Sequence, residues 1–245
     1  MEDLSKLEET REEKTYRSWV NSMGVDPHVN WLSSDLFNGI VFQLFDAIQP
    51  GCVDWSKVKK KFPSLSKLMD QIGNCNYAIE LGKRQFSLVD IQGKDIYDGN
   101  RTHTLAFMSQ LMRAYTLSVL SSVTTSTGKD RLDTDNAIVN WVNEKLNKSG
   151  KSSRIGSFQD SSISDAKVVC DLIDAIQPGT IDYSLLKDGR SFKENLANAK
   201  YAITVSRKIG AKVYALPEDI VEVKPKMVMA LFACLMARNY MSNVE

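Results

Sequence analysis

The chain has 245 residues, of which 43% are hydrophobic and 25% are charged, as in an ordinary soluble globular protein. Its 31 basic and 30 acidic residues nearly cancel, which argues against a nucleic-acid-binding protein because that class carries excess positive charge. No apolar run approaches the roughly 18 residues of a membrane-spanning helix, and the N-terminus is too acidic for a signal peptide, so we expect a cytoplasmic protein without a membrane partner.

The first half of the chain shows the periodicity of helices. Residues 1–10 are polar, and we expect them to form a flexible tail. Asp35 is the expected N-cap of the second helix, Asn100 is that of the last, and Leu68 is expected to face inward from the third. The apolar spacing predicts helices over residues 11–23, 35–48, 66–84 and 101–120, with a short helical turn over residues 93–100.

The second half repeats this plan. Asp133 or Thr134 is the expected N-cap of its first helix and Ser164 that of its second. Pro225 suits the first turn of the last helix, where a missing N–H costs nothing. Strand alternation is not convincing anywhere, so the class is all-α. The expected helices cover residues 133–148, 164–176, 191–208 and 224–240.

The two halves are related by sequence. LFDAIQPG (44–51) returns as LIDAIQPG (172–179), Trp19-Val20-Asn21 returns as Trp141-Val142-Asn143, and LAFMSQLM (105–112) is matched by MALFACLM (229–236). Blocks in the same order, at offsets of 122 to 128, indicate a tandem duplication of a small domain. We expect four main helices plus short helical turns in each domain, with boundaries at residues 1–10 for the tail, 11–120 for the first domain, 121–131 for a Ser/Thr-rich linker and 132–242 for the second domain.

The last helix of each copy is apolar nearly all round, which is typical of a helix at the centre of a small helical domain. The four cysteines form no CxxC pair, and three of them lie in apolar helical patterns. We therefore expect buried, reduced thiols rather than disulfides or metal ligands.

Motifs for catalysis are incomplete. SGKSS (149–153) resembles the end of a phosphate-binding loop, but Lys145 stands where that loop needs a glycine. DTDNAIVNWVNE (133–144) has three acids at calcium-loop spacing. However, Ala137 stands at position 5, which supplies a calcium ligand, and Ile138 stands at position 6, where a glycine makes the sharp turn. The chain has two histidines and lacks HExxH, GxSxG and GxGxxG, so we expect no metal, no cofactor and no enzymatic activity.

One charge cluster stands out. Lys57, Lys59, Lys60 and Lys61 place four cations within five residues. The segment is either a solvated loop or a contact with an acidic partner surface.

Longer runs resemble a known family. The tandem is similar to paired calponin-homology domains of the spectrin type, and its longer runs resemble the C-terminal actin-binding domain of the fimbrin (plastin) family. The resemblance covers about residues 10–240. It rests on TREEKTYRSWVNSMGVDPHVN (10–30), NCNYAIELGK (74–83), GNRTHTLAFMSQLMRAYTLSVL (99–120), VVCDLIDAIQPGTIDYSLL (168–186) and NAKYAITVSRKIGAKVYALPEDIVEVKPKMVMALFACLM (198–236).

The resemblance implies a four-main-helix module built around its last helix, and binding to F-actin. In such tandems actin contact is assigned mostly to the first helix, the last helix and a basic segment of the first module. Carried over, the contact residues are Arg11, Lys14, Arg17, Lys57, Lys59, Lys60, Lys61, Arg101, His103, Met108, Arg113 and Tyr115.

The chain departs from the family at two places. Ser109 stands where members usually carry a tryptophan, and His103 where they carry a leucine. Whole members also have EF-hands and a second actin-binding domain upstream, to which nothing here corresponds. We therefore expect a monomeric fragment that binds filaments in the actin cytoskeleton but bundles them poorly alone. The alternative is a calponin-homology scaffold for another cytoskeletal or signalling partner.

Overall fold

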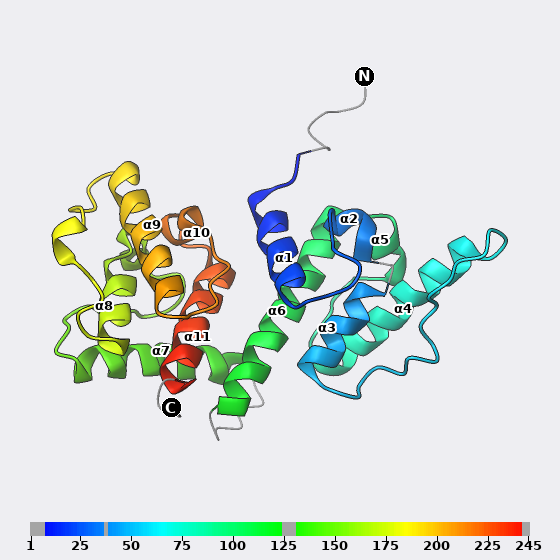
Figure 1. Ribbon diagram of the computed structural model, residues 1–245, viewed down its shortest axis with the longest axis horizontal. Coiled ribbons are helices and arrows are strands. Elements are labelled where there is room, and N and C mark those ends of the chain that lie inside the picture. The colour runs from blue at the N-terminus through cyan, green and yellow to red at the C-terminus, as the bar shows by residue number, and fades with distance from the viewer. Residues whose placement is uncertain (1–7, 37–38, 124–130, 242–245) are drawn as a thin grey trace. The chain divides into compact units, whose positions relative to one another are not determined.

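The computed structural model describes residues 8–36, 39–123 and 131–241 (Figure 1). The chain divides into two compact units, Met1–Ser118 and Val119–Glu245. Within the described residues every regular element is a helix, which confirms the all-α class.

Each unit contains the main helices and short turns that the sequence predicted. α6 begins in the first unit and stays helical to Val123, three residues into the expected linker. The first unit holds α1 (Arg11–Ser22), α2 (Leu32–Asp35), α3 (Ile40–Ile48), α4 (Lys67–Gln85), α5 (Gly93–Tyr97) and α6 (Arg101–Val123). The second holds α7 (Arg131–Lys148), η3 (Ser161–Asp165), α8 (Lys167–Ile176), η4 (Tyr183–Leu185), α9 (Phe192–Lys208), α10 (Pro217–Val221) and α11 (Pro225–Met241).

α6 is the central helix of the first unit. Phe107 has no exposed surface, and its ring centroid lies 6.2 Å from that of Phe45 in α3 and 6.3 Å from that of Phe86 after α4. Gly82 permits this packing, because a Cβ there would lie 2.8 Å from a Leu88 methyl and 3.2 Å from the Phe107 ring. The prediction of a buried last helix is therefore confirmed in this unit.

α11 has the same role in the second unit. Leu231 and Phe232 are buried, and Phe232 stacks at 6.2 Å on Phe158, which lies in the segment between α7 and α8. Pro225 is the first residue of α11, as predicted. Burial also raises the pKa of Cys75 and Cys170 to about 12, and all four cysteines are free thiols.

Helix starts were predicted less well. Asn100 does cap α6, because its side-chain oxygen accepts a hydrogen bond from the His103 N–H at 3.2 Å. Asp35 is not the N-cap of a helix through Ile48. It ends α2, its carboxylate accepts N–H groups of the preceding loop, and α3 starts only after Gly39, whose φ of 92° is left-handed.

The predicted caps of the second unit differ in the same way. Ser164 does not cap α8, since it lies in η3 and donates its hydroxyl to the carbonyl of Val221 at 2.7 Å. α8 instead begins at Lys167, after Ala166 in the left-handed region at φ 60°. The side chains of Asp133 and Thr134, the alternatives for α7, lie outside the described residues.

A polar cluster joins the segment after α7 to α8 and η4. The Lys151 ammonium donates to Asp174 at 2.6 Å and to the Tyr183 hydroxyl at 2.7 Å, and that hydroxyl donates to Asp171 at 2.9 Å. Burial opposes the ionisation of Asp174. Hydrogen bonds from Lys151 and the Gly179 N–H outweigh it, so the pKa of Asp174 is lowered.

Replacing the lysine tests this cluster. Lys151→Met is expected to destabilise the second unit by about 2 kcal/mol at neutral pH, because Asp174, whose side chain is 15% exposed, keeps a charge without its cation. A carboxyl group whose pKa is lower in the folded chain than in the unfolded chain stabilises the fold at pH values above its unfolded pKa of about 3.9. This stabilisation is lost as the pH falls through the folded pKa. The difference between variant and wild type should therefore shrink below about pH 4. Hydrogen exchange of α8 amides measures this difference in the free energy of unfolding. A difference that does not change with pH would contradict the ion pair.

Candidate binding surface

The lysine loop, Lys57 to Lys61, is held in place by α4. The Asn74 side chain accepts a hydrogen bond from the Lys59 N–H and donates one to the Lys59 carbonyl, both at 2.9 Å. The Tyr77 hydroxyl accepts a hydrogen bond from the Asp54 N–H at 2.8 Å. A buried amide and a phenol therefore fix the backbone that presents the lysines.

The second unit has the same frame. Asn198 bonds both backbone groups of Lys187, at 2.8 and 3.1 Å, and the Tyr201 hydroxyl accepts from the Asp182 N–H at 2.8 Å. In the aligned loop, however, Leu185 and Asp188 stand opposite Lys57 and Lys60. Because the frame forms without this run of cations, the fold does not require the run.

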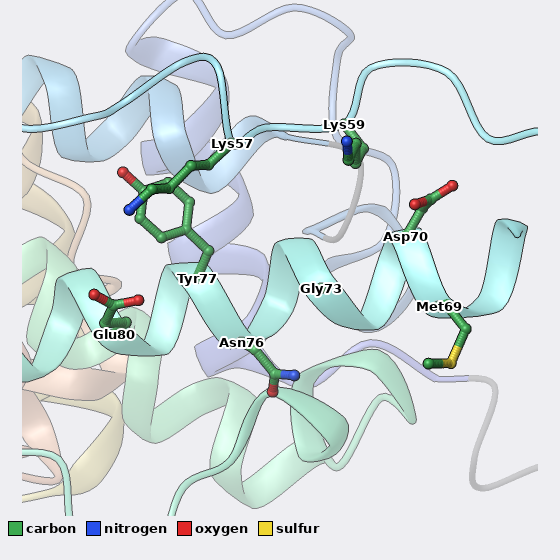
Figure 2. A pocket seen from close by; sticks show the side chains of 8 residues that line it. All are labelled: Lys57, Lys59, Met69, Asp70, Gly73, Asn76, Tyr77 and Glu80. Atoms are coloured by element: carbon green, nitrogen blue, oxygen red, sulfur yellow. The ribbon is translucent and has the colours of Figure 1, made fainter.

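The four lysines are exposed, and the loop edges a groove of about 310 Å³ along α4. Lys57 lies 5.5 Å from the ring centroid of Tyr77, and Lys60 lies 5.5 Å from that of Trp55. Figure 2 shows Lys57 over the Tyr77 ring, with Met69 toward the other end of the groove. The groove is lined by Lys57, Lys59, Met69, Asp70, Gly73, Asn76, Tyr77 and Glu80.

Exposed apolar side chains that sequence reasoning did not assign to a binding surface follow the lysine loop in the chain, and one of them, Met69, lines the groove with Lys57 and Lys59. Leu65 is 104% exposed, Met69 73% and Leu68 53%. The prediction that Leu68 faces inward is wrong. It keeps the helical spacing of the buried side chains further along α4, but the first turn of α4 extends beyond the other helices of the unit, so more than half of the Leu68 side chain stays exposed (Figure 1). Periodicity reports the face of a helix and not where its neighbours end. We call Leu65, Leu68 and Met69 the apolar patch.

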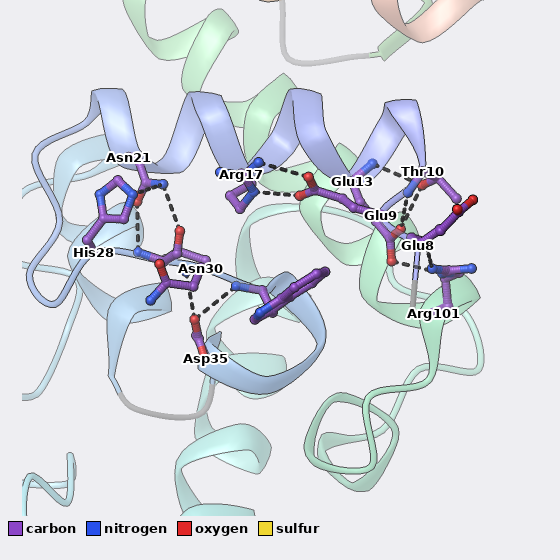
Figure 3. Close-up of polar contacts among 12 residues, drawn as sticks. Glu8, Glu9, Thr10, Glu13, Arg17, Asn21, His28, Asn30, Asp35 and Arg101 are labelled. Atoms are coloured by element: carbon purple, nitrogen blue, oxygen red, sulfur yellow. Dashed lines mark hydrogen bonds and ion pairs between the residues drawn. The ribbon is translucent and has the colours of Figure 1, made fainter. Parts of the chain in front are cut away.

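A second group of predicted residues lies where α1 meets α6. The Arg17 guanidinium donates to both carboxylate oxygens of Glu9, at 2.5 and 2.8 Å, and this raises the pKa of Arg17. Arg101 donates to Glu13 at 2.8 Å and to the Glu8 carbonyl at 2.8 Å (Figure 3). Burial opposes ionisation of Glu13, but hydrogen bonds from the Thr10 N–H and Arg101 outweigh it and lower the pKa of Glu13.

The start of α1 explains this arrangement. Thr10 and Glu13 form a capping box, in which the Glu13 N–H donates to the Thr10 hydroxyl at 3.2 Å and the Thr10 N–H donates to the Glu13 carboxylate at 2.7 Å. The last residues of the expected tail, Glu8 to Thr10, are therefore bonded to α1 and α6.

The remaining predicted residues differ in exposure. Arg11 and Lys14 are exposed. His103 is partly exposed, with its Nδ1 3.1 Å from a carboxylate oxygen of Asp95. Met108 has no exposed surface, so in this conformation it offers nothing to a partner. Three further residues of α6 are partly exposed: Arg113, Tyr115 and Ser109, the residue that stands in place of the family's usual tryptophan. The Tyr115 ring centroid lies 6.0 Å from that of Trp19 in α1.

Among the residues that the structure describes, histidine, cysteine and acidic side chains nowhere gather in a group of three or more that could hold a metal ion. None of the helices that these residues form has the length and apolar character needed to cross a membrane.

Comparison with known proteins identifies the fold family. The calponin homology (CH) domain model matches residues 10–117 and again residues 132–240. The chain belongs to the CH-domain family. Its tandem CH domains are 55% identical to plastin-3 of Rattus norvegicus over 239 residues, which is 96% of this chain and 37% of that protein.

Two further relatives agree. Fimbrin of Dictyostelium discoideum is 50% identical over 238 residues, covering 96% of this chain and 38% of that protein. The crystal structure of the actin-crosslinking core of Schizosaccharomyces pombe fimbrin matches with a TM-score of 0.79 and 40% identity, over 93% of this chain and 48% of that one. The resemblance to fimbrin and plastin is thus confirmed, and the chain spans well under half the length of the curated relatives it matches.

Proposed function

We propose that this chain is an F-actin-binding module of a filament-crosslinking protein of the fimbrin type. The observation that carries the proposal is the lysine loop with its adjacent apolar patch, presented on a frame that the second unit builds without the cation run. The names of the relatives support it, since one solved neighbour is described as an actin-crosslinking core.

The charge and apolar surface of the lysine loop and the apolar patch suit contact with an acidic filament. Exposed cations raise the rate of encounter with a negatively charged surface through long-range attraction. Apolar side chains then contribute by leaving water on contact, and Leu65 is fully exposed and Met69 largely exposed before binding. The proposed contact set comprises this surface, the three cations of α1 and the α6 residues with exposed surface, which are Arg11, Lys14, Arg17, Arg101, His103, Arg113 and Tyr115.

The test is high-speed cosedimentation of the chain with F-actin, at about 0.05 M and about 0.15 M salt. Saturable pelleting that weakens at the higher salt is expected, because exposed charges are screened. Microtubules and intermediate filaments serve as controls. Equal decoration of all three filaments would favour a general scaffold, and the absence of pelleting with actin would contradict the proposal.

The apolar patch gives a separate prediction. Leu65→Ser combined with Met69→Ser is expected to weaken F-actin binding about fivefold, because two side chains no longer bury apolar surface. Stability should change by less than about 0.5 kcal/mol, since the residues are 104% and 73% exposed. Val89→Ser is the matched control, being 72% exposed beyond the end of α4. Equal weakening by the control would contradict a contact at the patch.

We propose further that the chain works as a monomer in the cytoplasmic actin cytoskeleton, and that EF-hands and another actin-binding domain belong to the full-length protein. One filament-binding module should decorate filaments without joining them. Low-speed pelleting of actin with this chain should therefore stay close to that of actin alone, and efficient bundling would contradict the monomeric proposal.

A further inference from the structure

Arg17 already holds a carboxylate of its own chain. Its guanidinium meets Glu9 through two hydrogen bonds, of 2.5 and 2.8 Å, which is the fork geometry by which arginine recognises a partner's carboxylate. The Arg17 side chain is 25% exposed and that of Glu9 is 19% exposed. The guanidinium that an acidic partner would bind is therefore mostly buried and already hydrogen-bonded to Glu9.

The segment that carries Glu9 is tied down on both sides. Arg101 from α6 donates to the Glu8 carbonyl at 2.8 Å, and Thr10 caps α1. Figure 3 shows Glu8, Glu9 and Thr10 between Arg17 and Arg101. We call these three residues the N-terminal strap.

The two acids that pair with arginines differ in how they can be displaced. Glu13 belongs to α1 and to its capping box, so its carboxylate also stabilises the start of the helix. Glu9 belongs to the strap and precedes the helix, and its carboxylate accepts two hydrogen bonds from Arg17 of α1. Exchange of this carboxylate for one of a partner would leave α1 and its cap intact.

We infer that Glu9 is a built-in competitor for Arg17, which an F-actin carboxylate must displace before it can bind there. This inference rests on the proposed function and deepens it, because it assigns a regulator to one of the contact residues. An ion pair at the surface is weak, so the strap lowers affinity without abolishing it.

The test is cosedimentation of Glu9→Gln with F-actin at low salt. The substitution keeps the shape of the side chain and removes its charge, so the dissociation constant is expected to fall about threefold. Glu12→Gln is the matched control. It makes the same charge change in α1, on a carboxylate that pairs with the Tyr16 hydroxyl at 3.2 Å instead of with an arginine.

A double-mutant cycle identifies the partner of Glu9. In an Arg17→Gln background the gain from Glu9→Gln should disappear, because no guanidinium remains to be released. Equal gains in Glu9→Gln and Glu12→Gln would overturn the inference in favour of general charge. Unchanged or weaker binding of Glu9→Gln would overturn it too, since Glu9 would then hold Arg17 in place.

The two hypotheses fail differently. If the strap does not compete, the unaltered chain still pellets with F-actin and Glu9→Gln does no better. If the proposed function is wrong, neither the unaltered chain nor any variant pellets, and the inference is overturned with it. Circular dichroism of Glu9→Gln should match that of the wild type, because the capping box is unchanged.

Discussion

Replacing all four lysines of the lysine loop with glutamate is expected to weaken F-actin binding by about 10- to 100-fold. The variant turns favourable charge pairs into like-charge contacts at the partner surface, which costs several kcal/mol in well-formed interfaces. The fold should survive, because the loop is held through the Lys59 backbone and the Tyr77 hydroxyl rather than through the ammonium groups. Cosedimentation at two salt concentrations measures the loss.

A matched variant separates the contact from the change in net charge. Lys193, Lys200, Lys208 and Lys212 are exposed in the second unit, and reversing them changes the net charge by the same amount. Binding by this control should fall only modestly and mainly at low salt, where long-range steering matters. Equal losses in the two variants would mean that the lysine loop is a solvated surface. The salt dependence of the lysine-loop variant should also be shallower than that of the wild type.

Phe107→Ala is expected to destabilise the first unit by about 4 kcal/mol, the range for deleting a large buried ring. Phe107 has no exposed surface and contacts the rings of Phe45 and Phe86, so the substitution leaves a cavity between α3, α4 and α6. With a typical urea dependence of about 2 kcal/mol per M, the midpoint of unfolding should fall by roughly 2 M.

Tryptophan fluorescence makes this measurement specific. Three of the four tryptophans, Trp19, Trp31 and Trp55, lie in the first unit, so a Trp141→Phe background reports on that unit alone. Phe232→Ala is the control, because it removes a fully buried ring from the central helix of the second unit. The control should move the first unit's midpoint little, since Phe232 lies in the core of the other compact unit. A midpoint unaffected by Phe107→Ala would contradict the central position of α6.

Local patterns were sufficient for most of the fold. The duplication, the all-α class and the buried last helix of each unit could be read from repeats and apolar spacing, because core contacts repeat with the helical period. Asn100 and Pro225 were placed correctly since their effects act within one helical turn. Asp35 and Ser164 were misplaced because a side chain suited to a cap also serves a loop or a distant carbonyl.

The sequence by itself determined that two copies of one helical domain exist and which segment concentrates cations. Only the tertiary structure decided what those side chains meet. It left Leu68 more than half exposed in the first turn of α4 and placed the Glu9 carboxylate on Arg17. It also joined α6 to the start of α1 through Arg101, 88 residues from its partner Glu13. The physical reason is range: propensity and periodicity act over one or two turns, whereas exposure and ion pairing depend on which distant elements end nearby.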